Sequence, residues 1–189
     1  MHRRPRDARF DTIYLVENHV HPGRSLTGGA ARRAFAEVLR GALDRHPVEL
    51  FGVAVAPDGY QMLARALDDR LPGFVRDVHR GVACALNELR DTRGSLWAGR
   101  VGYHSMRSHC ESVTTLVDLL VDGVSRGAVD HPAEDRLLNS YAALVGGEAL
   151  VPHTVLPYHG ALTDAGLARR LVAAVDARLA AARAWSRAG

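Results

Sequence analysis

The sequence predicts an α+β fold: a four-stranded antiparallel sheet covered by helices, with extra helices toward the C-terminus. Apolar residues recur at helical spacing over 30–46 and 74–90, and short apolar runs typical of strands lie before, between and after these segments. The turn sequence Ala56-Pro57-Asp58-Gly59 separates two adjacent apolar runs, which favours a β-hairpin. The resulting order of strand, helix, strand, strand, helix, strand is that of a ferredoxin-like split βαβ unit.

The first half of this order follows from the apolar pattern. Residues 10–17 contain the run Ile-Tyr-Leu-Val and form the expected first strand, and a loop over 18–29 follows it. The segment 30–46 should form an amphipathic helix that stops before Pro47, because a residue preceding proline disfavours helical geometry. The runs 48–56 and 60–67 are the two strands of the hairpin.

The second half continues with a helix over 74–90 and a last strand over 101–107. Ser112 is expected to cap a helix that runs to Val121, and 132–144 suggests a short helix. Thr163 should cap a final helix that extends to about Arg187. That helix places four apolar residues on one side: Leu167, Leu171, Val175 and Leu179.

This reading divides the chain into four parts. Residues 1–8 form a basic, proline-interrupted arm that we expect to be flexible. Residues 9–147 form the main domain, 148–162 a linker with two prolines, and 163–189 the C-terminal helix.

The composition is that of an ordinary globular protein. The 189 residues are 47% hydrophobic and 24% charged, with a formal net charge of +3, so a nucleic-acid surface would require clustering of the basic residues. All 24 basic residues are arginines, whose planar fork suits phosphate groups. Cys84 and Cys110 are expected to be reduced thiols. No apolar run reaches 18 residues, so we expect a cytoplasmic protein without a membrane role.

Three stretches resemble one known family. They are the strand pair over 48–67, the segment Gly94-Ser-Leu-Trp-Ala-Gly-Arg100, and the helix and turn over 116–129. They resemble the single-tyrosine transposases of the insertion-sequence-200-like group, which includes the transposases associated with repetitive extragenic palindromes. The resemblance covers roughly residues 8–147, and it implies the same ferredoxin-like fold.

The resemblance also shows what this chain lacks. The family carries Pro-Asn-His-hydrophobic-His-Leu on a central strand, and two imidazoles projecting from one strand face hold a divalent metal against the scissile phosphate. This chain has Gly59 and Gln61 at the two histidine positions, and the position of the nucleophilic tyrosine falls on Asp118. The position of an asparagine four residues later falls on Asp122. We therefore expect no catalytic residue, no metal ligand and no cofactor.

Binding of DNA does not require the lost groups. The expected nucleic-acid contacts are Arg93, Trp97, Arg100, Arg107 and Arg126, since guanidinium groups can grip phosphates and an indole can stack on an unpaired base. The alternative for Trp97 is packing against the domain, and Arg100 could pair with Glu88 or Glu111. The leading hypothesis is a catalytically inactive relative that binds hairpin or single-stranded DNA and would then be associated with the nucleoid.

Two alternatives stay open. The first is a nicking enzyme that depends on Mg²⁺ or Mn²⁺, with His19 and His21 as relocated ligands, Asp118 or Asp122 completing the shell, and Tyr60 or Tyr103 as a displaced nucleophile. The second is a protein-interaction module, with homodimers among its assemblies, that buries the apolar stripe of the last helix. Tyr141 matches a family tyrosine to which we assign a structural role.

Overall fold

The structure, a computed structural model, describes residues 12–125, 138, 141, 151 and 164–188 of the chain. The first six elements are β1 (Ile13–His19), α1 (Gly29–Leu43), β2 (Val48–Ala56), β3 (Gly59–Ala66), α2 (Leu71–Leu89) and β4 (Gly102–Ser105). The helices α3 (His109–Ser125) and α5 (Asp164–Ala188) follow. The four strands form one sheet in the order β2-β3-β1-β4, and every neighbouring pair is antiparallel. The predicted fold class and strand order are confirmed.

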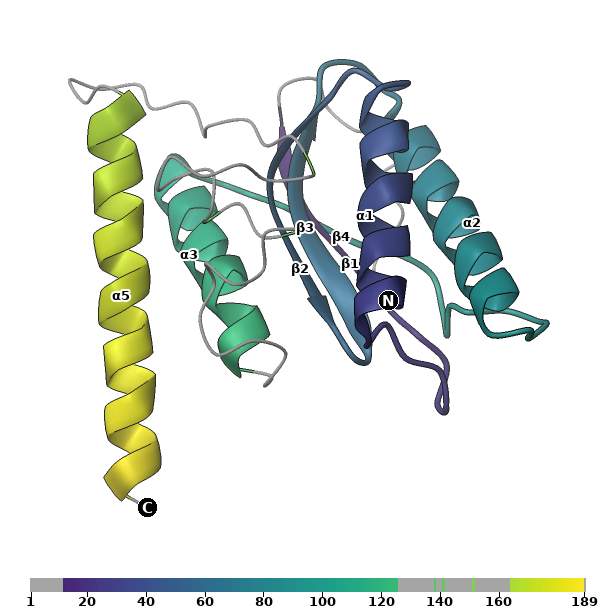
Figure 1. The fold of residues 1–189 in the computed structure, drawn as a ribbon. Helices are drawn as coiled ribbons and strands as arrows, with labels where there is room; N and C mark the ends of the chain where they lie inside the picture. The colour runs from purple at the N-terminus through teal and green to yellow at the C-terminus, as the bar shows by residue number, and fades with distance from the viewer. Residues whose placement is uncertain (1–11, 126–137, 139–140, 142–150, 152–163, 189) are drawn as a thin grey trace.

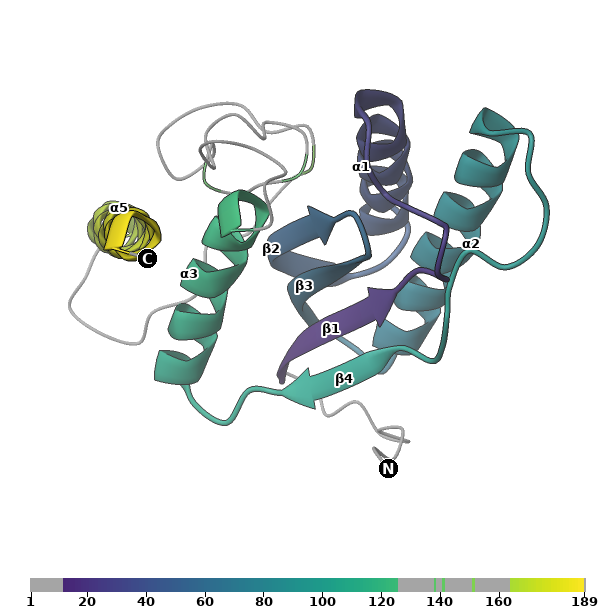
Figure 2. The ribbon, with the colours of Figure 1, turned by 90° about the horizontal axis from the view of Figure 1, so that it is seen from below.

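The sheet separates two helical layers (Figures 1 and 2). Helices α1 and α2 pack together on one face, while α3 lies on the other face over β2 and β3. Helix α5 packs on the side of α3 that faces away from the sheet (Figure 1). None of the described helices is both long enough and apolar enough to cross a membrane.

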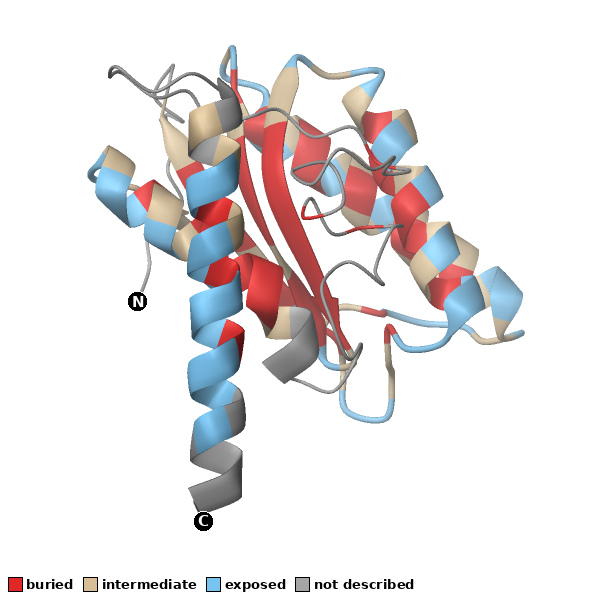
Figure 3. Cartoon of the chain, turned by 60° about the vertical axis from the view of Figure 1, so that its left-hand side comes forward, coloured by how far each residue is buried: buried red, intermediate tan, exposed pale blue. Residues whose placement is uncertain are grey.

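Each sheet face has its own core because successive strand residues point to opposite sides. On β3, Tyr60 and Met62 belong to the core under α1 and α2, whereas Leu63 belongs to the core under α3. Figure 3 shows the central strands as a continuous buried band between the helical layers. Because Gln61 shares the face of Leu63, it lies on the side of the sheet that α3 covers in part.

The ends of several elements differ from the prediction. β1 continues to His19 because its pairing with β3 extends as far as Gly59. Helix α2 begins at Leu71 because a proline is accepted in the first helical turn. Helix α3 begins at His109, and its cap is Ser108, whose Oγ accepts a hydrogen bond from the backbone N–H of Glu111 at 3.1 Å.

Other sequence-based predictions about the chain's organisation remain untested. The basic arm at 1–8 lies outside the described residues, as do most of the short helix suggested at 132–144 and of the linker at 148–162.

Candidate functional site

A row of polar side chains crosses three strands at one end of the sheet, on the face that α3 covers in part. Gln61 of β3 lies opposite Glu17 of β1 in the strand register, and β4 adds His104. The Gln61 Nε2 donates a hydrogen bond to Glu17 Oε2 at 3.0 Å, and His104 Nε2 lies 3.0 Å from Glu17 Oε1. We call Gln61, Glu17 and His104 the polar row.

The polar row holds Glu17 as a carboxylate. The hydrogen bond from Gln61 lowers the pKa of Glu17 most, burial acts in the opposite direction, and His104 lowers the pKa further. Gln61 therefore uses its amide to satisfy a carboxylate. Gln61, which the sequence resemblance aligns with one of the family's two metal-binding histidines, is engaged in a strand-to-strand contact.

The other matching position, Gly59, has no room for a side chain. A Cβ built at Gly59 would lie 2.3 Å from the backbone oxygen of Asn18 and 3.2 Å from His19 Nδ1. Because the first contact is with backbone, a side chain at this position would require β1 and β3 to separate locally. The close approach of the two strands thus explains why glycine stands here.

His19 and His21, the predicted relocated ligands, are placed differently from each other. His19 is the exposed last residue of β1, opposite Gly59. His21 lies in the loop that follows, and its backbone N–H donates to the carbonyl of Leu96. Within residues 12–125 and 164–188, no three His, Cys, Asp or Glu side chains are grouped so that they could hold a metal ion.

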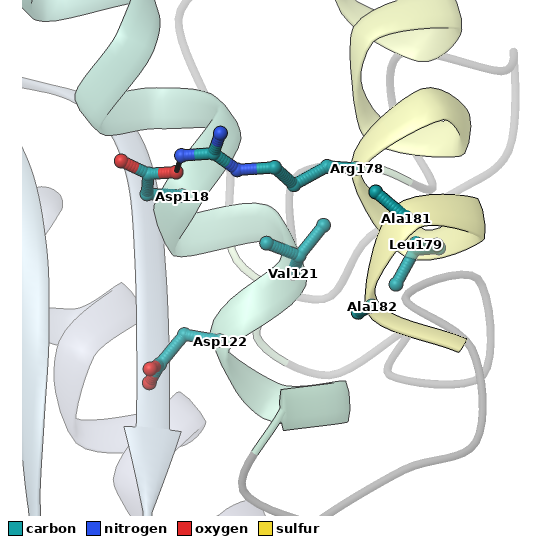
Figure 4. Close-up of a pocket in the computed structure, with 7 residues that line it drawn as sticks. All are labelled: Asp118, Val121, Asp122, Arg178, Leu179, Ala181 and Ala182. Atoms are coloured by element: carbon teal, nitrogen blue, oxygen red, sulfur yellow. Dashed lines mark hydrogen bonds and ion pairs between the residues drawn. The ribbon is translucent and has the colours of Figure 1, made fainter. Parts of the chain in front are cut away.

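The two aspartates of α3 face a different part of the molecule. The carboxylate of Asp118 accepts a hydrogen bond from Arg178 of α5 at 2.5 Å, as Figure 4 shows. Asp118, Asp122 and Arg178 line an open cavity of about 410 Å³ between α3 and α5. The Asp118 carboxylate, which the sequence resemblance aligns with the family's tyrosine, thus takes part in the contact between α3 and α5.

Trp97 packs against the domain. Its ring stacks on the His79 ring, with centroids 4.4 Å apart and planes 18° apart, and its Nε1 donates to the His79 carbonyl at 3.0 Å. The edge of Trp97 meets Tyr60 with ring centroids 5.6 Å apart. Packing within the domain therefore occupies one face of the indole ring and its N–H donor. A DNA contact of Trp97 remains a prediction.

The histidine of this cluster is partly buried and neutral. Burial lowers the pKa of His79 to about 4, and burial also raises the pKa of Tyr60. The two side chains share a hydrogen bond of 2.6 Å between Tyr60 Oη and His79 Nε2, and a neutral imidazole that carries its proton on Nδ1 accepts this bond from the phenol. Tyr60 therefore lies on the opposite sheet face from Gln61, in the core under α1 and α2, as does the partly buried Tyr103.

Three of the predicted arginines lie along one edge of the sheet. Arg93 is in the loop after α2, and Arg100 and Arg107 flank β4, the edge strand. All three side chains are exposed, and their guanidinium groups make no ion pair or hydrogen bond within the described residues. Arg100 thus does not pair with Glu88 or Glu111. Arg126 lies outside the described residues.

Tyr141 has the structural role that was expected of it. Its side chain is buried, and its hydroxyl donates a hydrogen bond of 3.3 Å to Asp176 of α5.

The contacts made by Glu17, His104 and His79 were not predicted from the sequence. A signal was present for Glu17, a polar residue on a strand whose apolar neighbours face both cores, whereas His104 lies on the short edge strand β4. It was too weak to join them, because the two residues are separated by 87 positions in the chain. His79 lies on an apolar helix stripe in the sequence, and only the tertiary packing shows its ring contacts.

Comparison with solved structures gives matches to transposases. The chain matches a REP-associated tyrosine transposase bound to a REP hairpin, with a TM-score of 0.64 and 13% sequence identity, over 86% of this chain and 98% of that chain. It also matches a proposed transposase from Deinococcus radiodurans R1, with a TM-score of 0.43 and 16% identity, over 61% of this chain and 93% of that chain. No family model matches, and no curated protein matches the sequence. The first likeness establishes that this chain has a tyrosine-transposase-like fold and confirms the fold that the motifs implied.

Proposed function

We propose that this protein binds hairpin or single-stranded DNA through the β4 edge and does not cut or rejoin DNA strands. One observation carries the proposal. On a transposase-like scaffold, the guanidinium groups of Arg93, Arg100 and Arg107 have no partner among the described residues, while Gly59 has no room for a side chain and Gln61 is hydrogen-bonded to Glu17. The fold neighbour that supports a DNA partner was solved bound to a REP hairpin.

The β4 edge suits phosphate contacts. Arg100 and Arg107 are seven positions apart and flank an extended strand, so their backbone positions are separated by roughly 20 Å at about 3.3 Å per residue. Each guanidinium can donate two parallel hydrogen bonds to a phosphate, and neither has a carboxylate partner that DNA would have to displace within the described residues. One face of the Trp97 indole is stacked on His79, so we expect phosphate contacts to contribute most of the binding free energy.

Loss of cleavage follows from the three positions that carry the family's chemistry. Gly59 offers no ligand and no space, Gln61 is bonded to Glu17, and Asp118 is paired with Arg178. A carboxylate that attacked phosphorus would form an acyl phosphate, which hydrolyses readily and would not keep DNA attached as a phosphotyrosine does. The protein therefore needs no metal for the function proposed.

Binding is tested by fluorescence anisotropy with labelled hairpin, single-stranded and duplex oligonucleotides at low salt. We expect the wild-type protein to bind a hairpin or a single strand, and the double variant Arg100→Ala/Arg107→Ala to bind at least tenfold more weakly. The matched control is Arg33→Ala/Arg40→Ala on exposed positions of α1, which removes the same charge from a helix that contacts β2, at the opposite edge of the sheet from β4. Absence of binding at low salt, or an equal loss in the control, would contradict the proposal.

Cleavage is tested by incubating a labelled hairpin with the protein and Mg²⁺ or Mn²⁺. We expect neither a cleaved strand nor a covalent protein–DNA product on a denaturing gel. A product that disappears in a His19→Ala/His21→Ala variant would instead support the enzyme with relocated ligands. Self-association that is lost on deleting residues 161–189, without DNA binding, would support the interaction module.

A further inference from the structure

Arg24 makes side-chain hydrogen bonds to the 90–101 loop, which carries the proposed DNA contacts Arg93, Trp97 and Arg100. It lies in the β1–α1 loop, and its Nη1 donates to Thr92 Oγ1 at 2.7 Å and to Asn87 Oδ1 at 3.3 Å. Its Nη2 donates to the backbone carbonyl of Arg93 at 2.6 Å. One side chain thus ties the end of α2 to the loop over 90–101, from a position more than 60 residues earlier in the sequence.

The contacts around Arg24 form a connected network. Asn87 Nδ2 donates to the carbonyl of Gly94 at 3.0 Å, and Thr92 Oγ1 donates to Asn87 Oδ1 at 3.1 Å. Within this loop, Asp91 and Gly94 have positive φ angles of 48° and 97°. Backbone conformations of this kind are costly for a residue such as aspartate, and they persist where surrounding contacts enforce them. The bonds made by Arg24 and Asn87 supply that enforcement.

The same two loops are also joined by backbone. Val20 pairs with Trp97 in an isolated antiparallel bridge, and the amide N–H of Ala98 donates to the carbonyl of His19. These bonds fix the Trp97 end of the loop, whereas Arg24 fixes the Arg93 end. Arg24 makes no ion pair with a carboxylate in the described part of the chain, so its charge adds to that of Arg93.

We infer that Arg24 is a positioning residue for DNA binding. Its guanidinium group orders the Arg93 end of the 90–101 loop, so the backbone at Arg93 already has its binding conformation before the Arg93 side chain contacts a phosphate. This inference rests on the proposed function. Ordering the loop in the free protein lowers the conformational entropy lost on binding, which raises affinity without adding a contact. Lysine cannot replace Arg24 here, because a single ammonium group lacks the planar fork that reaches two side chains and a carbonyl together.

A double-variant cycle on hairpin binding tests the inference. Arg24→Ala and Arg93→Ala should each weaken binding, and the double variant should bind no more than about twofold more weakly than Arg24→Ala alone, because the two residues act through one loop. Arg107→Ala, which lies outside the Arg24 network, combined with Arg93→Ala provides the control and should show independent, multiplying effects. Independent effects of Arg24 and Arg93 would overturn the inference.

A second measurement does not depend on DNA. Amide hydrogen exchange over residues 91–95 should be at least tenfold faster in both Arg24→Ala and Arg24→Lys than in the wild type, while exchange in the strands β1 and β3 stays unchanged. Unchanged exchange in the loop, or hairpin affinity fully retained by Arg24→Lys, would show that Arg24 contributes charge only. If the wild-type protein binds no DNA, the proposed function fails, while the exchange result still decides whether Arg24 orders the loop.

Discussion

At the residue scale, the polar row joins three strands through the side chain of one carboxylate. Gln61 can serve Glu17 or a metal ion with its amide, and in this protein it donates to Glu17. His104 satisfies the second oxygen of the same carboxylate. A half-buried carboxylate with both oxygens bonded stabilises the three strands that it joins, because neither oxygen is left without a partner.

Gly59 should resist substitution on the same face of the sheet. Gly59→Ala places a Cβ against the carbonyl oxygen of Asn18, and we expect the free energy of unfolding to fall by about 1–3 kcal/mol. Urea denaturation measures this change. Gly99→Ala is the matched control, since a Cβ there meets nothing within 4 Å. Equal stability of the two variants would show that the strands can separate easily at Gly59.

His79 should make stability depend on pH in the acid range. The folded protein holds His79 neutral with a pKa of about 4, against an ordinary value of 6.5, so the unfolded chain binds more protons between these values. The free energy of unfolding should therefore be unaffected by this residue above pH 6.5 and should fall as the pH drops toward 4. The loss should reach at most about 3 kcal/mol.

The variant His79→Gln isolates this effect, because glutamine keeps a hydrogen-bond acceptor for Tyr60 without a group that titrates in this range. Urea denaturation of both proteins between pH 4 and 7 gives the comparison. The wild type should lose more stability than the variant on acidification, and parallel pH profiles would contradict the assignment of a partly buried, neutral imidazole.

At the scale of elements, α3 is buried on two sides. Leu116 and Leu120 belong to its core, which also contains Leu63 of β3 and the α5 stripe Leu171, Val175 and Leu179. The spacing of four residues in that stripe keeps one side of α5 on α3. The pair Asp118–Arg178 sits at the exposed rim of the same contact, where water screens the attraction.

The apolar stripe of α5 should therefore stabilise the α3–α5 contact more than the Asp118–Arg178 ion pair does. Leu171→Ala removes a side chain that is 2% exposed, and we expect a loss of about 2–5 kcal/mol in the stability of the α3–α5 contact. Asp118→Ala should cost less than about 1 kcal/mol. Hydrogen exchange of α5 amides and urea denaturation measure both effects. A larger loss in Asp118→Ala than in Leu171→Ala would contradict this order.

At the scale of the whole molecule, the fold places Arg100 and Arg107, whose guanidinium groups have no partner in the part of the chain that the structure describes, beside β4, the strand that carries His104 of the polar row. β4 pairs only with β1, so its outer side remains an open strand edge within the described residues. The charges that flank it, at Arg100 and Arg107, are consequently available to a large anionic partner, although the net charge of the chain is only +3.

Salt dependence checks this arrangement. If Arg100 and Arg107 each neutralise a phosphate in a hairpin stem, the slope of log affinity against log salt concentration should become shallower by roughly 0.9 for each arginine replaced by alanine. Anisotropy titrations between 50 and about 200 mM salt give the slopes. An unchanged slope in Arg100→Ala and Arg107→Ala would show that the DNA lies elsewhere on the protein.

The order of elements, the antiparallel sheet and the absence of histidines at positions 59 and 61 were determined by the sequence alone. Local periodicity is enough to predict the elements, because strands and helices differ in the spacing of their apolar residues. Only the tertiary structure decided that Glu17 and His104 meet Gln61, that Trp97 stacks on His79, and that Asp118 pairs with Arg178. Those contacts join residues 18 to 87 positions apart, and they depend on strand register and helix packing, which no local pattern encodes.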